Sequence, residues 1–127
     1  MSTNKSAIDD AVARYIAAWN ETDAARRRAL VAQTWTEDGT FRDPIVGGEG
    51  HDGIAVMIGV VQQKLPLYRF RLISGIDAHN GRVRYRWEAG GTAEAPLYFA
   101  GTDFAVLAPD GRFASVTGFL DAMPTGV

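Results

Sequence analysis

Three residues of the sequence could together carry acid–base chemistry: Tyr15, Asp43 and Asp103. Asp43 precedes Pro44, and a residue before proline is held in an extended or turn conformation, so a stiff backbone would aim its carboxylate. An ionised carboxylate can take a proton from a carbon next to a carbonyl, while a phenol and a protonated carboxylic acid donate hydrogen bonds to the oxyanion that develops. The alternative for Asp43 is a common Asp-Pro turn in which the carboxylate caps its own backbone.

The first of these residues lies in a predicted amphipathic helix. Apolar residues recur at helical spacing from Ile8 to Trp19, which places Tyr15 on the inner face. A tyrosine there is a common core residue, but burial obliges its hydroxyl to find a partner. Tyr15 is therefore a candidate both for the core and for a site.

Two further helices and a short strand are predicted before residue 67. Asp23 can cap a helix over 24–34, and Asp52 can cap one over 54–64 that Pro66 stops. Residues 40–43 form the expected strand between them. The glycine-rich stretch 47–50 is a flexible turn or a weak edge strand.

From residue 67 onward the apolar pattern alternates, and turn dipeptides recur at 80–81, 90–91 and 110–111. This pattern predicts four long strands in an antiparallel meander. In the third, over 96–107, Asp103 shares a face with apolar side chains. An ionised carboxylate on such a face must be paired, protonated or facing a cavity. The alternative is a structural acid bonded to a neighbouring hydroxyl or amide.

Composition excludes several kinds of function. The 127 residues include no cysteine and only two histidines, His51 and His79, so a disulfide and a thiol nucleophile are excluded, and we expect no metal or other cofactor. A net charge of −2 argues against nucleic acid as a partner. The sequence shows neither a signal peptide nor a membrane span, so we expect a cytoplasmic protein that does not bind membranes.

The order of the elements predicts a fold class. Helices first and a multi-stranded sheet afterwards describe an α+β domain, with three N-terminal helices on one face of a curved antiparallel sheet. We expect a single domain over 1–127, with its core about 6–122. A sheet curved around helices leaves a cone-like cavity, where a small apolar molecule would bind.

Four features resemble one family: the segment 14–20 (Arg-Tyr-Ile-Ala-Ala-Trp-Asn), the Asp43-Pro44 pair after a short strand, the segment 64–67 (Lys-Leu-Pro-Leu) and the Asp103 strand. Together they look like the ketosteroid isomerases of the nuclear-transport-factor-2-like (SnoaL-like) superfamily, which are cone-shaped domains with a cystatin-like roll. The resemblance covers roughly 12–121. It implies that Asp43 is the general base, Tyr15 the oxyanion-binding tyrosine and Asp103 the protonated acid that shares the oxyanion.

The sequence also departs from that pattern at two positions. Val61 falls about where the isomerases carry a further tyrosine that supports the oxyanion tyrosine, and Trp35 falls where tyrosine or phenylalanine is usual. The loss of a hydrogen-bond partner should weaken the donor network. The superfamily also includes polyketide cyclases, dehydratases, epoxide hydrolases and binding modules, so fold resemblance does not settle function.

The leading hypothesis is a cofactor-independent isomerase that transfers a proton on a small apolar or steroid-like carbonyl compound. The residues expected to line its pocket are Trp19, Trp35, Met57, Val61, Phe99 and Phe119, with Trp87 as a further candidate. A second hypothesis is a ligand-binding or dimerising module without catalysis. A third is a polyketide cyclase-like or dehydratase-like enzyme in which Asp43, or His51 near the cavity mouth, is the acid–base group.

A homodimer is expected because the strand over 96–107 is apolar on both faces, and its second face needs covering. The neighbouring strand carries an outward row of basic residues, Arg82, Arg84 and Arg86. This row is either a solvated sheet face or part of the dimer contact.

Overall fold

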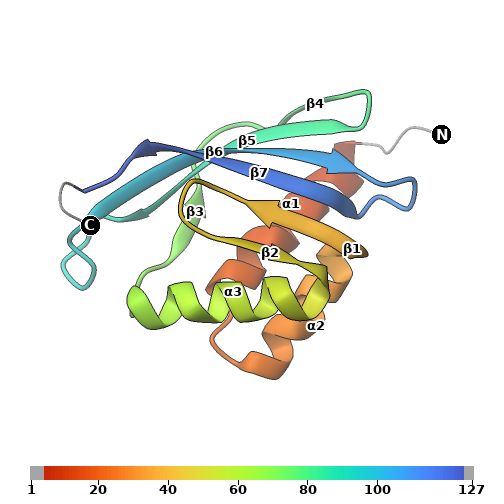
Figure 1. Ribbon diagram of the computed structural model, residues 1–127. Helices are drawn as coiled ribbons and strands as arrows, with labels where there is room; N and C mark the ends of the chain where they lie inside the picture. Colours follow the sequence, from red (N-terminus) through yellow and green to blue (C-terminus); the bar gives the residue numbers. More distant parts are fainter. Residues whose placement is uncertain (1–4, 125–127) are drawn as a thin grey trace.

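The computed structural model describes residues 5–124 and shows an α+β fold in which all three helices lie on one face of a curved sheet (Figure 1). The helices are α1 (Lys5–Asn20), α2 (Ala24–Thr34) and α3 (Gly50–Lys64). The strands are β1 (Trp35–Arg42), β2 (Gly47–Glu49), β3 (Phe70–Leu72), β4 (Asp77–His79), β5 (Arg82–Gly90), β6 (Tyr98–Leu107) and β7 (Phe113–Ala122). The predicted class of helices packed against a curved sheet is confirmed.

The sheet is mixed, although its pairings are mostly antiparallel. Its strand order is β2-β1-β7-β6-β5-β3, and β4 pairs with the N-terminal end of β5. β1 runs parallel to β7, with Phe41 opposite Val116, and every other pair is antiparallel. The expected antiparallel meander is confirmed for β5, β6 and β7, and the parallel pairing arises where β1, the strand after α2, lies beside the C-terminal strand.

Several predicted boundaries differ from the structure. The first of the four expected long strands is two short strands, β3 and β4, which pair with different halves of β5. Asp23 does cap α2, accepting a hydrogen bond from the Arg26 amide at 2.9 Å. α3 begins at Gly50, so Asp52 lies in its first turn instead of capping it, and it pairs with Arg28 at 2.7 Å.

The buried core lies between the helices and the concave face of the sheet. Tyr15 and Val12 of α1, Ile54 and Ile58 of α3, and Val83 of β5 are all almost fully buried there. The alternation on β5 is confirmed, because Val83 and Tyr85 point inward while the three arginines of the basic row are exposed. None of the described helices is both long and apolar enough to cross a membrane.

Candidate active site

A cavity opens between the helices and the concave face of the sheet. Its volume is about 190 Å³, and its wall comes from α1, α3, β1 and the loop after it, β3, and strands β5 to β7. Most of the wall is apolar. Ile45, Val60, Phe119 and Met123 belong to the wall yet are more than a third exposed, so they form the rim where the cavity meets solvent. The space is enclosed and apolar enough to bind a small molecule.

Tyr15 and Asp103 meet in the wall of this cavity. The Tyr15 hydroxyl donates to Asp103 Oδ2 at 2.6 Å, across the gap between α1 and β6, and each residue is 2% exposed. The Tyr15 ring is held by neighbouring rings, with centroids 5.4 Å from both Trp35 and Tyr85. This packing fixes the hydroxyl, so the pair presents a rigid, short hydrogen bond to the cavity.

Asp103 has an unusual acidity because it is buried. Burial raises the pKa of Asp103 from its ordinary 3.8 to about 6, and the charges of Asp43 and Asp121 add to the rise, while hydrogen bonds from Tyr15 and Trp87 act against it. The Trp87 indole N–H donates to Asp103 Oδ1 at 3.2 Å. Burial, followed by the charge of Asp103, raises the pKa of Tyr15 well above 10. Tyr15 is therefore neutral at physiological pH, and Asp103 changes its protonation state near pH 6.

Asp43 reaches the same cavity from the loop between β1 and β2. Its Oδ1 accepts hydrogen bonds from the backbone amides of Ile45 and Val46, each at 2.8 Å. The turn interpretation is therefore confirmed for this oxygen. Oδ2 has no hydrogen-bond partner among residues 5–124, and Asp43 is a half-buried part of the cavity wall. The loop thus holds one carboxylate oxygen and leaves the other for a ligand.

Gly118 separates the two carboxylates, and sequence reasoning did not single it out. It is the β7 partner of Asp103, and a Cβ placed on it would stand 3.0 Å from Asp103 Oδ1 and 3.1 Å from Asp43 Cβ. The absence of a side chain therefore lets both acids approach the same point of the wall. A glycine inside a strand is a known sign of close approach, so the sequence did contain a signal.

Trp87 reaches Asp103 because of a second strand glycine. Trp87 pairs with Gly101 across β5 and β6, and a Cβ on Gly101 would collide with the indole ring. The indole can therefore lie across β6 toward Asp103, two residues along the strand. The alternation on β5 predicts an inward Trp87, but no local pattern in the sequence indicates its hydrogen bond to Asp103.

The structure brings together most of the residues expected to line the pocket. Trp19, Val61, Phe99 and Phe119 lie in the cavity wall, as does Trp87, and whether they bind a ligand stays a prediction. Trp35 and Met57 do not lie in the wall, which corrects the expectation for both. Trp35 is fully buried beneath Tyr15, and its indole N–H donates to the Thr40 carbonyl at 3.2 Å. Met57 is buried in the core.

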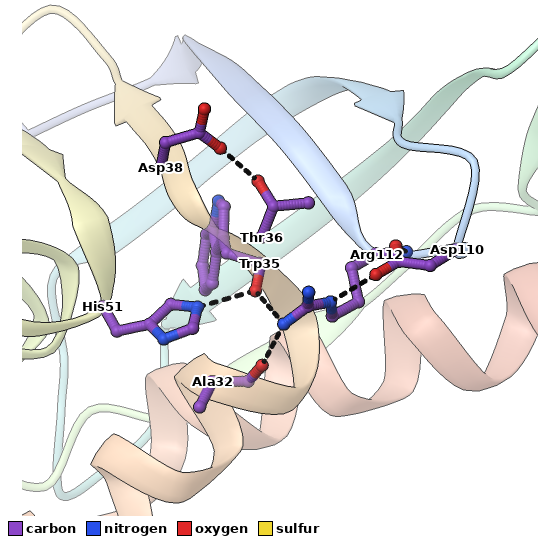
Figure 2. Close-up of polar contacts among 7 residues, drawn as sticks. All are labelled: Ala32, Trp35, Thr36, Asp38, His51, Asp110 and Arg112. Carbon is purple, nitrogen blue, oxygen red and sulfur yellow. Dashed lines mark hydrogen bonds and ion pairs between the residues drawn. The ribbon is translucent and has the colours of Figure 1, made fainter.

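His51 lies away from the cavity wall, contrary to the expectation that it stands near the mouth. Figure 2 shows its ring directed at the Trp35 carbonyl, which Nε2 contacts at 2.8 Å. A carbonyl oxygen only accepts, so Nε2 carries a proton in this contact. Arg112 donates to the same carbonyl at 3.3 Å and to the Ala32 carbonyl at 3.1 Å. His51 and Arg112 thus donate hydrogen bonds to carbonyl groups at the C-terminal end of α2. This gives His51 a structural role.

Lys64, in the last turn of α3, is the one cation that residues 5–124 contribute to the cavity wall. It is exposed and has no hydrogen bond or ion pair with any residue in the described range. The acids therefore occupy the wall at the sheet, and a positive charge lies on a helix at the same cavity. Among the described residues no group of three or more histidine or acidic side chains could hold a metal ion.

Three helices on a curved sheet, with an apolar cavity between them and polar side chains in one part of its wall, form an α+β domain of the NTF2-like fold. Comparison with known proteins places the chain more narrowly. The family model described as "SnoaL-like domain" matches residues 12–116. The chain therefore belongs to the SnoaL-like family. No curated protein sequence matches the chain.

Solved structures of relatives agree with this assignment. A crystal structure from Agrobacterium tumefaciens str. C58, described as "a putative isomerase of the SnoaL-like family", is 40% identical over 92% of this chain and 99% of that one, with a TM-score of 0.85. A cystatin-like protein of unknown function from Methylobium petroleophilum PM1 is 16% identical over 100% and 84% of the chains, with a TM-score of 0.77. A "Putative SnoaL-like polyketide cyclase" from Jannaschia sp. CCS1 is 15% identical over 95% and 91%, with a TM-score of 0.71. The last two likenesses show the fold alone.

Proposed function

We propose that this protein is a cofactor-independent isomerase that moves a double bond in a compact, apolar carbonyl compound by proton transfer. The observation that carries the proposal is that a short Tyr15–Asp103 hydrogen bond and a half-free carboxylate of Asp43 lie in the wall of one apolar cavity. The likeness to the Agrobacterium protein, described as "a putative isomerase of the SnoaL-like family", supports the same reaction class.

The proposed reaction uses the three residues in separate roles. Asp43 Oδ2 takes the proton from the carbon between the carbonyl and the double bond of a β,γ-unsaturated ketone. The electron pair of that C–H bond moves into a dienolate, whose oxygen accepts hydrogen bonds from Tyr15 and from protonated Asp103. The Asp43 carboxylic acid then returns the proton to the γ-carbon. The product is the conjugated α,β-unsaturated ketone, and no atom is gained or lost.

Asp103 must be protonated to donate in this step. In the empty cavity its pKa of about 6 leaves it mostly ionised at pH 7. An apolar substrate would exclude water from Asp103, and exclusion of water raises the pKa of a carboxyl group. We therefore expect substrate binding above pH 6 to be accompanied by proton uptake. We also expect the rate at subsaturating substrate to fall as the pH rises above about 6.

The size of the cavity bears on the substrate. Ligand pockets commonly measure about 300–1,000 Å³, and this cavity is smaller, at about 190 Å³. We therefore favour a substrate with one or two rings over a tetracyclic steroid. Any longer apolar part would extend over the rim formed by Ile45, Val60 and Phe119.

The test is isomerisation of cyclohex-3-enone and of a β,γ-unsaturated 3-ketosteroid, followed by the ultraviolet absorbance of the conjugated product. We expect the wild type to act on the smaller ketone, and Asp43→Asn to lower kcat by about 10²–10⁴, the usual contribution of a general base. Asp38→Asn is the matched control, since Asp38 is an exposed acid on β1 that bonds Thr36 outside the cavity (Figure 2).

Two results would contradict the proposal in different ways. Unchanged turnover in Asp43→Asn would show that another group is the base. Tight binding of the ketone by the wild type without turnover would favour the alternative of a non-catalytic ligand-binding module. For the cyclase-like alternative we favour Asp43 over His51 as the acid–base group, because the His51 ring contacts the Trp35 carbonyl and lies outside the cavity wall.

A further inference from the structure

The hydroxyl of Tyr85 is buried without a partner next to the candidate active site. Tyr85 lies on β5, is 1% exposed, and its Oη forms no hydrogen bond with any residue in the range 5–124. A buried hydroxyl that gives up water without gaining a partner is destabilising, so native structures contain few of them. This one needs an explanation other than stability.

Its neighbours identify the groups that it could serve. Tyr85 is the β5 partner of Asp103, so the two side chains stand side by side on the concave face of the sheet. Its ring meets that of Tyr15 edge to face, with centroids 5.4 Å apart. Burial raises the pKa of the Tyr85 hydroxyl well above its ordinary value, and the charge of Asp103 raises it further. The unpartnered O–H therefore lies against both members of the hydrogen-bonded pair.

The Tyr15 oxygen has acceptor capacity that the structure leaves unused. A phenol can donate one hydrogen bond and accept others, and Tyr15 spends its proton on Asp103 Oδ2. The Trp19 indole N–H, one turn along α1 from Tyr15, is likewise buried and unpartnered among the described residues, with ring centroids 6.4 Å apart. Two donors without partners thus belong to rings that contact Tyr15, whose oxygen can accept. Such an arrangement is costly at rest and becomes favourable when that oxygen gains negative charge.

We propose that Tyr85 is a positioning residue of the site, whose hydroxyl donates to the Tyr15 oxygen when Tyr15 gives its own hydrogen bond to negative charge. This inference rests on the proposed role of Tyr15 as an oxyanion donor. A phenol whose oxygen accepts a hydrogen bond becomes a stronger donor through its own O–H, because hydrogen bonds in a chain polarise one another. Tyr85 is absent from the cavity wall, so it acts on the substrate only through Tyr15.

The first measurement needs no substrate. In Tyr85→Phe the Tyr15 bond to ionised Asp103 should weaken, so the pKa of Asp103, followed by the carbon-13 resonance of its carboxyl group, should rise by about 0.5 units. The other charges that act on Asp103 are those of Asp43 and Asp121, and both are unchanged in the variant. The difference between variant and wild type therefore reports the hydroxyl alone.

The second measurement is kinetic. With the small ketone, Tyr85→Phe should lower kcat about tenfold, which is the rate effect of a loss of transition-state stabilisation equal to one pKa unit. KM should change less than twofold, because the ground-state contacts of the substrate are intact. Tyr98→Phe is the matched control. It removes a tyrosine hydroxyl from the neighbouring strand, where that hydroxyl is exposed and donates to Glu88 at 2.8 Å, and it should leave both readouts unchanged.

The outcomes separate this inference from the proposed function. A hydroxyl that is merely an unpaired group predicts a more stable Tyr85→Phe protein with the Asp103 pKa and kcat unchanged, and that result would overturn the inference. A raised Asp103 pKa in a protein that isomerises neither ketone would support the Tyr85 role and reject the isomerase. Thermal unfolding of each variant verifies that it is folded.

Discussion

Replacement of Asp103 by asparagine should make the protein more stable at pH 7. The asparagine side chain resembles the protonated acid, because its amide oxygen can accept from the Trp87 indole and its NH₂ group can donate to the Tyr15 oxygen. The Trp87 N–H and the Tyr15 oxygen then keep a partner, but the Tyr15 proton, which Asp103 Oδ2 accepts in the wild type, loses its acceptor. The charge that burial disfavours is removed.

The sign and size follow from the pKa of Asp103. An aspartate in the unfolded chain takes up its proton near pH 4, while Asp103 in the folded protein does so near pH 6. The folded state therefore binds more protons between these values, and the free energy of unfolding falls as the pH rises from about 4 to about 6. The change from 3.8 to about 6 amounts to about 3 kcal/mol at pH 7. The unsatisfied Tyr15 proton costs part of this gain, so we expect Asp103→Asn to add up to about 2 kcal/mol.

The assay is urea unfolding of wild type and variant at pH 4, 5, 6 and 7, with Asp38→Asn as the control for loss of an exposed carboxylate. The stability difference between Asp103→Asn and wild type should be smallest at pH 4 and reach its full value near pH 7. Titration of all other groups cancels in this difference. A variant that is less stable than wild type at pH 7, or a difference that does not vary with pH, would show that Asp103 is an ionised structural acid and not a group held near its protonated form.

Three further predictions concern the cavity and the outer sheet face. Gly118→Ala should lower kcat about 10²-fold with little change in stability, because the added Cβ would displace the Asp103 or Asp43 carboxylate from its position at the cavity. Initial rates measure kcat, and thermal unfolding followed by circular dichroism measures stability. An unchanged kcat would show that the two acids do not act together. Lys64→Met should raise KM about threefold for a ketone that carries a carboxylate, because it removes an exposed ion pair between Lys64 and the substrate, and such pairs contribute about 0–1 kcal/mol. KM for the neutral ketone should not change. Equal effects on both substrates would exclude a charge contact. We propose that the outer sheet face, where Phe104 is 40% exposed, forms a homodimer contact. Phe104→Glu should then sediment as a monomer. A wild-type protein that sediments as a monomer would exclude the dimer.

Periodicity allowed the sequence to predict which way the main site residues face. Tyr15 follows helical spacing and Asp103 follows strand spacing, and both spacings report a side chain's direction relative to the core without any long-range information. The structure accordingly places both on inner faces and hydrogen-bonded to each other. The stiff Asp43-Pro44 turn is a local feature as well, and its backbone hydrogen bonds lie within three residues.

Features that depend on pairing between distant segments could not be predicted in the same way. The parallel contact of β1 with β7 joins segments more than 70 residues apart. Similarly, Gly118 lies opposite Asp103 because of the β6–β7 register, and no local pattern states that register. Trp35 illustrates a different limit: its inward direction was evident, but the inner side of the sheet contains both a filled core and a cavity, and periodicity does not distinguish them.

The same burial that shapes the site explains why its polar groups are costly to keep. Asp103 is nearly enclosed, its charge is disfavoured, and beside it Tyr85 carries a hydroxyl with no partner in the described part of the chain. Apolar residues at both positions would give a more stable core. A fold that keeps an acid near its protonated form, and spare donors next to a phenol, gains nothing for its stability from them. If the proposed function holds, their value lies in the reacting state, in which negative charge passes from Asp43 to the oxygen of an enolate and the donors at Tyr15 and Asp103 stabilise that oxygen.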